Sequence, residues 1–191
     1  ESRGLGDVYK RQDASLLERL LEHIRRPPAG GNRYDYKNWA LNVDGVESAY
    51  VYPLRRGLGT VDIVITADNN VPSEETIAKC QAYIDEVRPV TAKEAKVVKP
   101  DVTLVNFNIA VSLSNSTLTE IKREIEQALA DYFKNLQPAN DLIVSQCEAI
   151  VSDLIGVVDR RFIQPSGNLK ANVTSKIEWF RLGTVTVTEM S

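Results

Sequence analysis

The chain has little of the chemistry that enzymes and metal proteins use. Its 191 residues contain one histidine, His23, and two cysteines, Cys80 and Cys147. Cysteines so few and so far apart cannot form a Cys-x-x-Cys redox pair or a metal cluster. His23 lies beside Arg25 and Arg26 with no paired nucleophile, so it is expected to be solvated or to cap a helix. The sequence therefore predicts no catalytic residue, no metal site and no cofactor.

Loops that bind nucleotides or calcium are also missing from the sequence. The Gly57-Leu58-Gly59 segment has neither the third glycine nor the following helix of a dinucleotide-binding loop. Asp68, followed by Asn69 and Asn70, predicts a turn and lacks the calcium-loop pattern. Lys93, Lys96 and Lys99 recur every third residue, which is typical of a solvated strand edge that discourages unwanted pairing.

No apolar run approaches the ~20 residues that span a bilayer, and no signal peptide is recognisable. A net charge of −3 does not favour a nucleic-acid surface. With 43% hydrophobic and 26% charged residues, the chain has the composition of an ordinary soluble globular protein. We therefore expect neither nucleic acid nor membrane as a partner, and a protein kept in the cytoplasm until it is assembled.

Residues 1–12 are set apart from the rest of the chain. The segment SRGLGDVYKRQ has no apolar period and looks like a translated artefact of sequencing or assembly, the alternative being a disordered native leader. Either interpretation removes these residues from the fold. The remaining length suffices for one or two small domains, each with its own core.

Helices and strands alternate through the first part of the chain. Ser15 and Glu18 form a capping box that begins a helix, and Pro27 ends it. The further elements predicted here are a helix at 34–41, strands at 46–54 and 60–66 that form a hairpin, a helix that begins at Pro72 and Ser73 and ends at Pro89, and a strand at 94–99.

A second module is predicted from Pro100 onward. Apolar residues alternate with polar ones over residues 105–113, which predicts a half-buried strand. Thr117 and Glu120 are predicted to cap a long helix, and Ser145 and Glu148 a second one that ends at Gly156. Two strands follow, at 157–164 and 173–187, the latter with a bend or bulge at Gly183.

Helical periodicity assigns several uncommon residues to the core. Cys80 and Cys147 each lie on an apolar stripe with i, i+3/i+4 spacing, which predicts buried free thiols. Trp39 shares a helical face with Tyr36 and Ala40 and is predicted to lie in the core of the first module.

A segment rich in proline and glycine, residues 27–32, precedes the first module, and we call it the corner. Pro27 and Pro28 remove amide donors and stop the helix, while Gly30 and Gly31 permit backbone angles closed to other residues. Read in order, the segment PPAGGNRYDYKNWALNVDGVESAYVYPLRRGLGTVDI resembles the baseplate J family of contractile-tailed phages, the wedge components of Mu-like tails and related prophage injection machines. The segments DASLLERLLEHIRRPPAGGN and FRLGTVTVTEMS fit the same pattern, so the resemblance covers about residues 13–191.

The sequence predicts an α+β protein of two small sheet-and-helix modules with an N-terminal helix. The first module is ordered helix-hairpin-helix-strand, and the second strand-helix-helix-strand-strand. The expected boundaries are 1–12 for the leader, 13–31 for the helix and corner, 32–100 for the first module and 101–191 for the second. Members of the family are usually longer at the N-terminus, so the chain is expected to be the C-terminal part of such a protein.

The resemblance implies a structural subunit of a phage or phage-like tail baseplate, with no enzymatic activity. Implied partners are other wedge and hub proteins, with self-association in a ring, and the implied location is the virion tail baseplate, assembled in the bacterial cytoplasm. The alternative is a ferredoxin-like regulatory domain that binds a small ligand. The predicted assembly interface comprises Leu17, Leu20, Leu21, Ile24, Pro27, Pro28, Gly30, Gly31 and Asn32. Because the corner has almost no side chain to bury, its contribution to the isolated fold is expected to be small.

Overall fold

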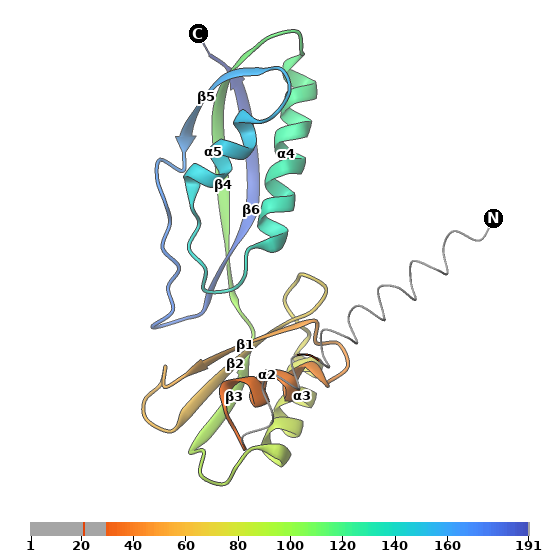
Figure 1. The fold of residues 1–191 in the computed structure, drawn as a ribbon, viewed down its shortest axis with the longest axis vertical. Helices are drawn as coiled ribbons and strands as arrows, with labels where there is room; N and C mark the ends of the chain where they lie inside the picture. The colour runs from red at the N-terminus through yellow and green to blue at the C-terminus, as the bar shows by residue number, and fades with distance from the viewer. Residues whose placement is uncertain (1–20, 22–29, 191) are drawn as a thin grey trace, which may run out of the picture. The chain divides into compact units, whose positions relative to one another are not determined.

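A computed structural model describes Leu21 and residues 30–190 of the chain. These residues fall into two compact units (Figure 1). The first unit holds the described residues up to Ile65 together with Pro72–Val97, and the second holds Thr66–Val71 and Val98–Ser191. The predicted α+β class and the predicted order of elements in both modules are confirmed. The predicted leader and, apart from Leu21, the predicted first helix lie outside the described residues.

The first unit is a small sheet packed against helices. Its elements are α2 (Arg33–Leu41), β1 (Ser48–Pro53), β2 (Thr60–Thr66), α3 (Glu74–Val87) and β3 (Glu94–Val98), and the sheet order is β1-β2-β3. The core joins Tyr36 and Ala40 of α2 and Cys80 and Ile84 of α3 to apolar residues of all three strands. Trp39 is only partly buried and packs against this core, so the aromatic ring at its centre is that of Tyr36, which is 1% exposed.

The second unit places two helices on one face of a longer sheet (Figure 1). Its elements are β4 (Asp101–Leu113), α4 (Leu118–Asn135), α5 (Val144–Ser152), β5 (Val157–Gln164) and β6 (Glu178–Glu189). The sheet order is β5-β4-β6, with β4 antiparallel to β5 and parallel to β6. Alternation along β4 sends Phe107, Ile109 and Val111 into the core, where they meet the buried face of α4.

The strongest sequence signals of the second unit are confirmed. Thr117 and Glu120 form the predicted capping box of α4, with the Thr117 side chain accepting from Glu120 N and the Glu120 side chain accepting from Thr117 N. The predicted irregularity at Gly183 is a bulge, since Val105 pairs with Leu182 but Phe107 pairs with Val185. A Cβ on Gly183 would lie 2.2 Å from Asn106 Oδ1, which accepts a hydrogen bond of 2.9 Å from Thr184 N. Glycine is therefore required by this close approach.

Several predicted element boundaries are wrong. Strand β4 begins at Asp101 rather than at residue 105, and α5 ends at Ser152 rather than at Gly156. Ser145 does not cap α5, because the helix begins at Val144 and its first amide donates 2.8 Å to Asn168 Oδ1, from a residue far along the chain. Strand β6 begins at Glu178 rather than at Val173. In the segment before β6, Asn172 Oδ1 accepts hydrogen bonds from the backbone amides of Thr174 and Ser175, both at 3.1 Å. An asparagine side chain thus organises a turn where propensity favoured a strand.

Candidate assembly surface of the first unit

Part of the predicted assembly interface is open to description. Leu21, Gly30, Gly31 and Asn32 belong to the described residues, whereas Leu17, Leu20, Ile24, Pro27 and Pro28 lie outside them, as does His23. The side chain of Leu21 is 38% exposed. The structure therefore describes mainly the C-terminal end of the predicted interface, where the chain enters α2.

Asn32 is the N-cap of α2 and takes part in a reciprocal capping box. Its Oδ1 atom accepts hydrogen bonds from Tyr34 N at 2.7 Å and Asp35 N at 3.1 Å. Asp35, which is 5% exposed, accepts in return from Gly31 N at 2.7 Å and Asn32 N at 3.1 Å. Four backbone donors at the helix entry are thus satisfied by two side chains. The Asn-x-x-Asp spacing of this capping box is present in the sequence, although no cap was predicted at Asn32.

The two glycines of the corner differ in their surroundings. Both have positive φ angles, 76° at Gly30 and 112° at Gly31. A Cβ on Gly31 would lie 2.5 Å from Pro89 Cγ, whereas a Cβ on Gly30 would meet nothing within 4 Å. Gly31 is therefore required where the corner passes the exit of α3. Gly31 and Asn32 thus make contacts with the fold that the expectation of a small contribution did not include, whereas a side chain at Gly30 would meet no neighbour.

A hollow of about 410 Å³ lies beside this corner. It is lined by Gly31, Asn32, Arg33, Tyr36, Val51, Pro53 and Val61. The buried hydroxyl of Tyr36 has no hydrogen-bond partner among the described residues, and burial raises the pKa of this phenol while the charge of Arg88 opposes the rise. The Tyr36 ring meets Trp39 edge to face at 5.1 Å. Walls of this kind can accept apolar side chains but contain no acid–base pair for catalysis.

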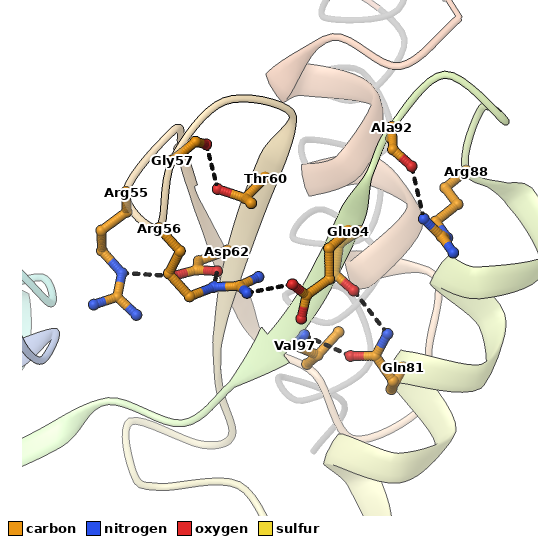
Figure 2. A network of polar contacts seen from close by, with 11 residues as sticks. Arg55, Arg56, Gly57, Thr60, Asp62, Gln81, Arg88, Ala92, Glu94 and Val97 are labelled. Atoms are coloured by element: carbon orange, nitrogen blue, oxygen red, sulfur yellow. Dashed lines mark hydrogen bonds and ion pairs between the residues drawn. The ribbon is translucent and has the colours of Figure 1, made fainter.

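A buried carboxylate fixes the hairpin loop between β1 and β2, as Figure 2 shows. The side chain of Asp62 is fully buried, and its oxygens accept from Arg55 Nε at 2.5 Å and Arg56 Nε at 2.6 Å. Arg56 Nη1 also reaches Glu94 Oε2 on the neighbouring strand at 2.6 Å. Hydrogen bonds to Asp62 and Glu94 raise the pKa of Arg56. The charges of the two loop arginines are thus balanced within the unit, which indicates a structural role for this cluster.

A helix side chain occupies the outer edge of β3 in the same view (Figure 2). Gln81 Nε2 donates to Ala95 O at 2.9 Å, and Gln81 Oε1 accepts from Val97 N at 2.7 Å. One amide side chain therefore bonds β3 as a neighbouring strand would. This arrangement disfavours strand addition along that edge, an effect that the sequence predicted for Lys93, Lys96 and Lys99.

The second unit contains two further polar clusters. Arg181 donates to Asn69 Oδ1, Asn69 O and Phe133 O, each at 3.0 Å, and lies 4.4 Å over the ring of Trp179. The turn that carries Asn69 is the predicted one, with positive φ angles at Asp68 and Asn69. Glu178 accepts from Lys176, Thr103 and Asn172 N, and these hydrogen bonds lower its pKa to about 2. Both clusters tie loops to β6.

Neither cysteine has the properties of a nucleophile. Cys80 and Cys147 are free and fully buried, as predicted. Burial raises the pKa of the Cys80 thiol to about 11 and that of Cys147 to about 12, so both are protonated at neutral pH. Within Leu21 and residues 30–190, no group of three or more His, Cys, Asp or Glu residues could hold a metal ion. None of the helices found in this part of the chain is long and apolar enough to cross a membrane.

The two described units thus define the class of the protein. It is an α+β protein of two modules, in which buried polar residues hold loops and helix ends in place. Comparison with known proteins identifies the family. Residues 28–99 match the Baseplate J-like central domain, and residues 105–188 match the Baseplate J-like protein C-terminal domain. The chain belongs to the baseplate J-like family, and the two matched domains follow one another directly along it.

Individual relatives agree with this assignment. The chain is 33% identical to the phage-like element PBSX protein XkdT of Bacillus subtilis over 94% of its length and 54% of that protein. It is 32% identical to the Mu-like prophage FluMu protein gp47 of Haemophilus influenzae, over 86% of its length and 50% of that protein. Identity to baseplate protein gp47 of Escherichia phage Mu is 30%, over 87% of the chain and 50% of the phage protein. The chain therefore spans about half the length of these curated relatives.

The fold also occurs in a solved assembly. A chain in the cryo-EM structure of the anti-feeding prophage baseplate, which was sixfold symmetrised, superposes with a TM-score of 0.62. The match covers 88% of this chain and 41% of the other, at 9% sequence identity. At that identity the likeness concerns the fold.

Proposed function

We propose that this chain is part of a structural subunit of a contractile tail baseplate, in a phage or a phage-like injection machine. The observation that carries the proposal is the presence of two consecutive baseplate J-like domains with the fold of a known baseplate chain. Its role is structural rather than enzymatic. In support, the described polar clusters are balanced internally, and both thiols are buried and protonated.

The mechanism is assembly and the transmission of conformational change between subunits. The partners are other wedge and hub proteins, copies of the same subunit associate in a ring, and the assembled protein resides in the tail baseplate. The proposed interface is formed by the apolar residues Leu17, Leu20, Leu21 and Ile24 and by the corner of Pro27, Pro28, Gly30, Gly31 and Asn32. The capping box supports this role, because it fixes the backbone where the chain enters α2.

No observation favours the alternative of a ferredoxin-like ligand-binding domain. That motif supplies four strands to one sheet, whereas each sheet of the described residues has three.

Deletion and complementation of the full-length gene test the proposal. Induced cells that lack the protein should yield no complete tail particles by electron microscopy, and a plasmid copy should restore them. A tail-sheath deletion made in parallel provides the reference for a failed particle. Complete, contractile particles in the absence of the protein would contradict the proposal.

A further inference from the structure

Part of the central strand of the second unit has a neighbour on one side only. In the sheet order β5-β4-β6, β6 pairs with β4 from Asp101 to Val111, whereas β5 pairs with it only from Asn108 to Leu113. Strand β4 thus continues past the end of β5 (Figure 1). The β5 side of residues 102–106 has no paired strand among the described residues, and we call this stretch the open edge.

Hydrogen bonds at the two ends of β4 show which main-chain groups point to the β5 side. Asp101 N donates to Ile177 O at 2.8 Å, on the β6 side, and Ser114 N donates to Gly156 O at 2.9 Å, on the β5 side. No residue is inserted in β4 between them, because the extra residue of each bulge lies on β5 or β6. Successive residues of a strand direct their N–H and C=O groups to opposite sides, so the even-numbered residues of β4 point to the β5 side.

The main-chain groups of Val102, Leu104 and Asn106 therefore face the open edge. Natural proteins protect such an edge with charged residues, proline, bulges or a covering element. The edge of β3 has such protection, because Gln81 bonds to it. The open edge reads Val-Thr-Leu-Val-Asn, with neither charge nor proline, and its strand contains no bulged residue. It is thus suited to pair with another strand.

Two exposed aliphatic side chains accompany the open edge. Val105 and Phe107 belong to the core of the unit, so alternation places Val102 and Leu104 together on the opposite face of the sheet. Their side chains are 42% and 65% exposed. A strand added at this edge would bring its own side chains beside them as cross-strand neighbours, which favours apolar residues at alternate positions of that strand.

We propose that an extended segment of a neighbouring baseplate subunit adds to the open edge as a fourth strand of this sheet. This inference rests on the proposed function. The main-chain groups of the open edge define the occupant as an extended backbone, and Val102 and Leu104 select apolar side chains at alternate positions. The available length, from Asp101 to Asn108, fits about five residues at ~3.3 Å each.

Hydrogen exchange tests the added strand at the backbone. In the isolated full-length protein, the amides of Val102, Leu104 and Asn106 should exchange rapidly, whereas those of Thr103 and Val105, which point to β6, should exchange slowly. In purified tail particles the three rapid amides should become protected. Equally rapid exchange in particles would overturn the proposal, and so would full protection of these amides in the isolated protein.

Photo-crosslinking identifies the occupant. A photo-crosslinking amino acid replaces Leu104 in the full-length protein, and Val158 in the control, which is 67% exposed on β5 of the same sheet. In particles, the Leu104 position should give an adduct, mapped by mass spectrometry, on a segment of another polypeptide with apolar residues at alternate positions. The control should lack this adduct. No such adduct, or an adduct within the same polypeptide, would overturn the proposal.

A charge on the open edge provides a third measurement. Leu104→Lys should leave the melting temperature unchanged, because the side chain is mostly exposed, and should lower incorporation into particles about tenfold. Val158→Lys adds the same charge to β5 and should incorporate normally. If wild type and Leu104→Lys enter particles equally well, strand addition is refuted while the baseplate role stands. Wild type absent from particles would instead refute both.

Discussion

The guanidinium of Arg181 binds both the side-chain oxygen and the backbone oxygen of Asn69, a residue 112 positions earlier in the chain. The same group donates to Phe133 O at the end of α4. Burial lowers the pKa of Arg181, which has no carboxylate among the partners that the structure shows. One arginine thus joins the 66–71 turn, α4 and β6 through hydrogen bonds to neutral oxygens.

Replacement of this arginine should destabilise the second unit. Arg181→Met keeps an unbranched stem over Trp179 but leaves the Asn69 and Phe133 oxygens unsatisfied, so the free energy of unfolding should fall by about 2–3 kcal/mol. Urea unfolding followed by Trp179 fluorescence in a Trp39→Phe background measures this. An unchanged midpoint would show that water replaces the lost bonds at no cost.

Alanine at the two corner glycines should separate backbone strain from steric conflict. Gly30 and Gly31 both have positive φ, so each substitution costs about 1 kcal/mol through the backbone. Gly31→Ala adds a clash with Pro89 and should lose a further 1–3 kcal/mol or so, whereas Gly30→Ala should not. Thermal unfolding of the two variants side by side gives the difference. Equal losses would mean that the Pro89 ring moves away freely.

Loss of the Tyr36 hydroxyl should leave the first unit equally stable or slightly more stable. The buried hydroxyl has no partner among the described residues, and an unsatisfied buried polar group costs about 1–3 kcal/mol. Tyr36→Phe removes the group and keeps the ring contact with Trp39. Denaturant unfolding should therefore give a midpoint at or above that of wild type. A clear loss of stability would reveal a partner for this hydroxyl.

Glu178 should contribute stability that disappears in acid. Its pKa falls from 4.5 to about 2 in the folded protein, so the contribution is complete above about pH 4.5 and is lost as the pH falls towards 2. The shift corresponds to at most about 3 kcal/mol. Glu178→Gln should accordingly reduce stability at pH 7 and flatten the pH dependence between these limits. Parallel curves for variant and wild type would contradict this assignment.

Both thiols should resist modification in the native protein. Cys80 and Cys147 are fully buried with raised pKa values, so a thiol reagent at pH 8 should react only as the units open. Absorbance should report two thiols per chain in denaturant and almost none without it. Rapid labelling of either cysteine under native conditions would show that its unit is open in solution.

Much of the fold could be predicted from local patterns in the sequence. The period of Ile121, Ile125, Leu129 and Phe133 and the Thr117–Glu120 box were sufficient to place α4, because a helix and its cap are set by residues near one another. The order of elements followed from the same kind of signal. Gly183 was recognisable because glycine within a strand marks a bulge or a close backbone approach.

Features made by distant residues could not be read in this way. The cap of α5 comes from Asn168, and the edge of β3 is closed by Gln81, both through side chains of ordinary surface type. The burial of Tyr36 rather than Trp39 depends on which side of a shared helical face meets the sheet.

Labelling of the full-length protein in purified tail particles tests the central claim most directly. An epitope tag on the complemented protein, detected with gold-conjugated antibody by electron microscopy, should place the label at the baseplate end of the tail in extended and contracted particles alike. Particles that carry no label there, although the tagged protein is present in the cells and restores function, would contradict a structural role in the baseplate.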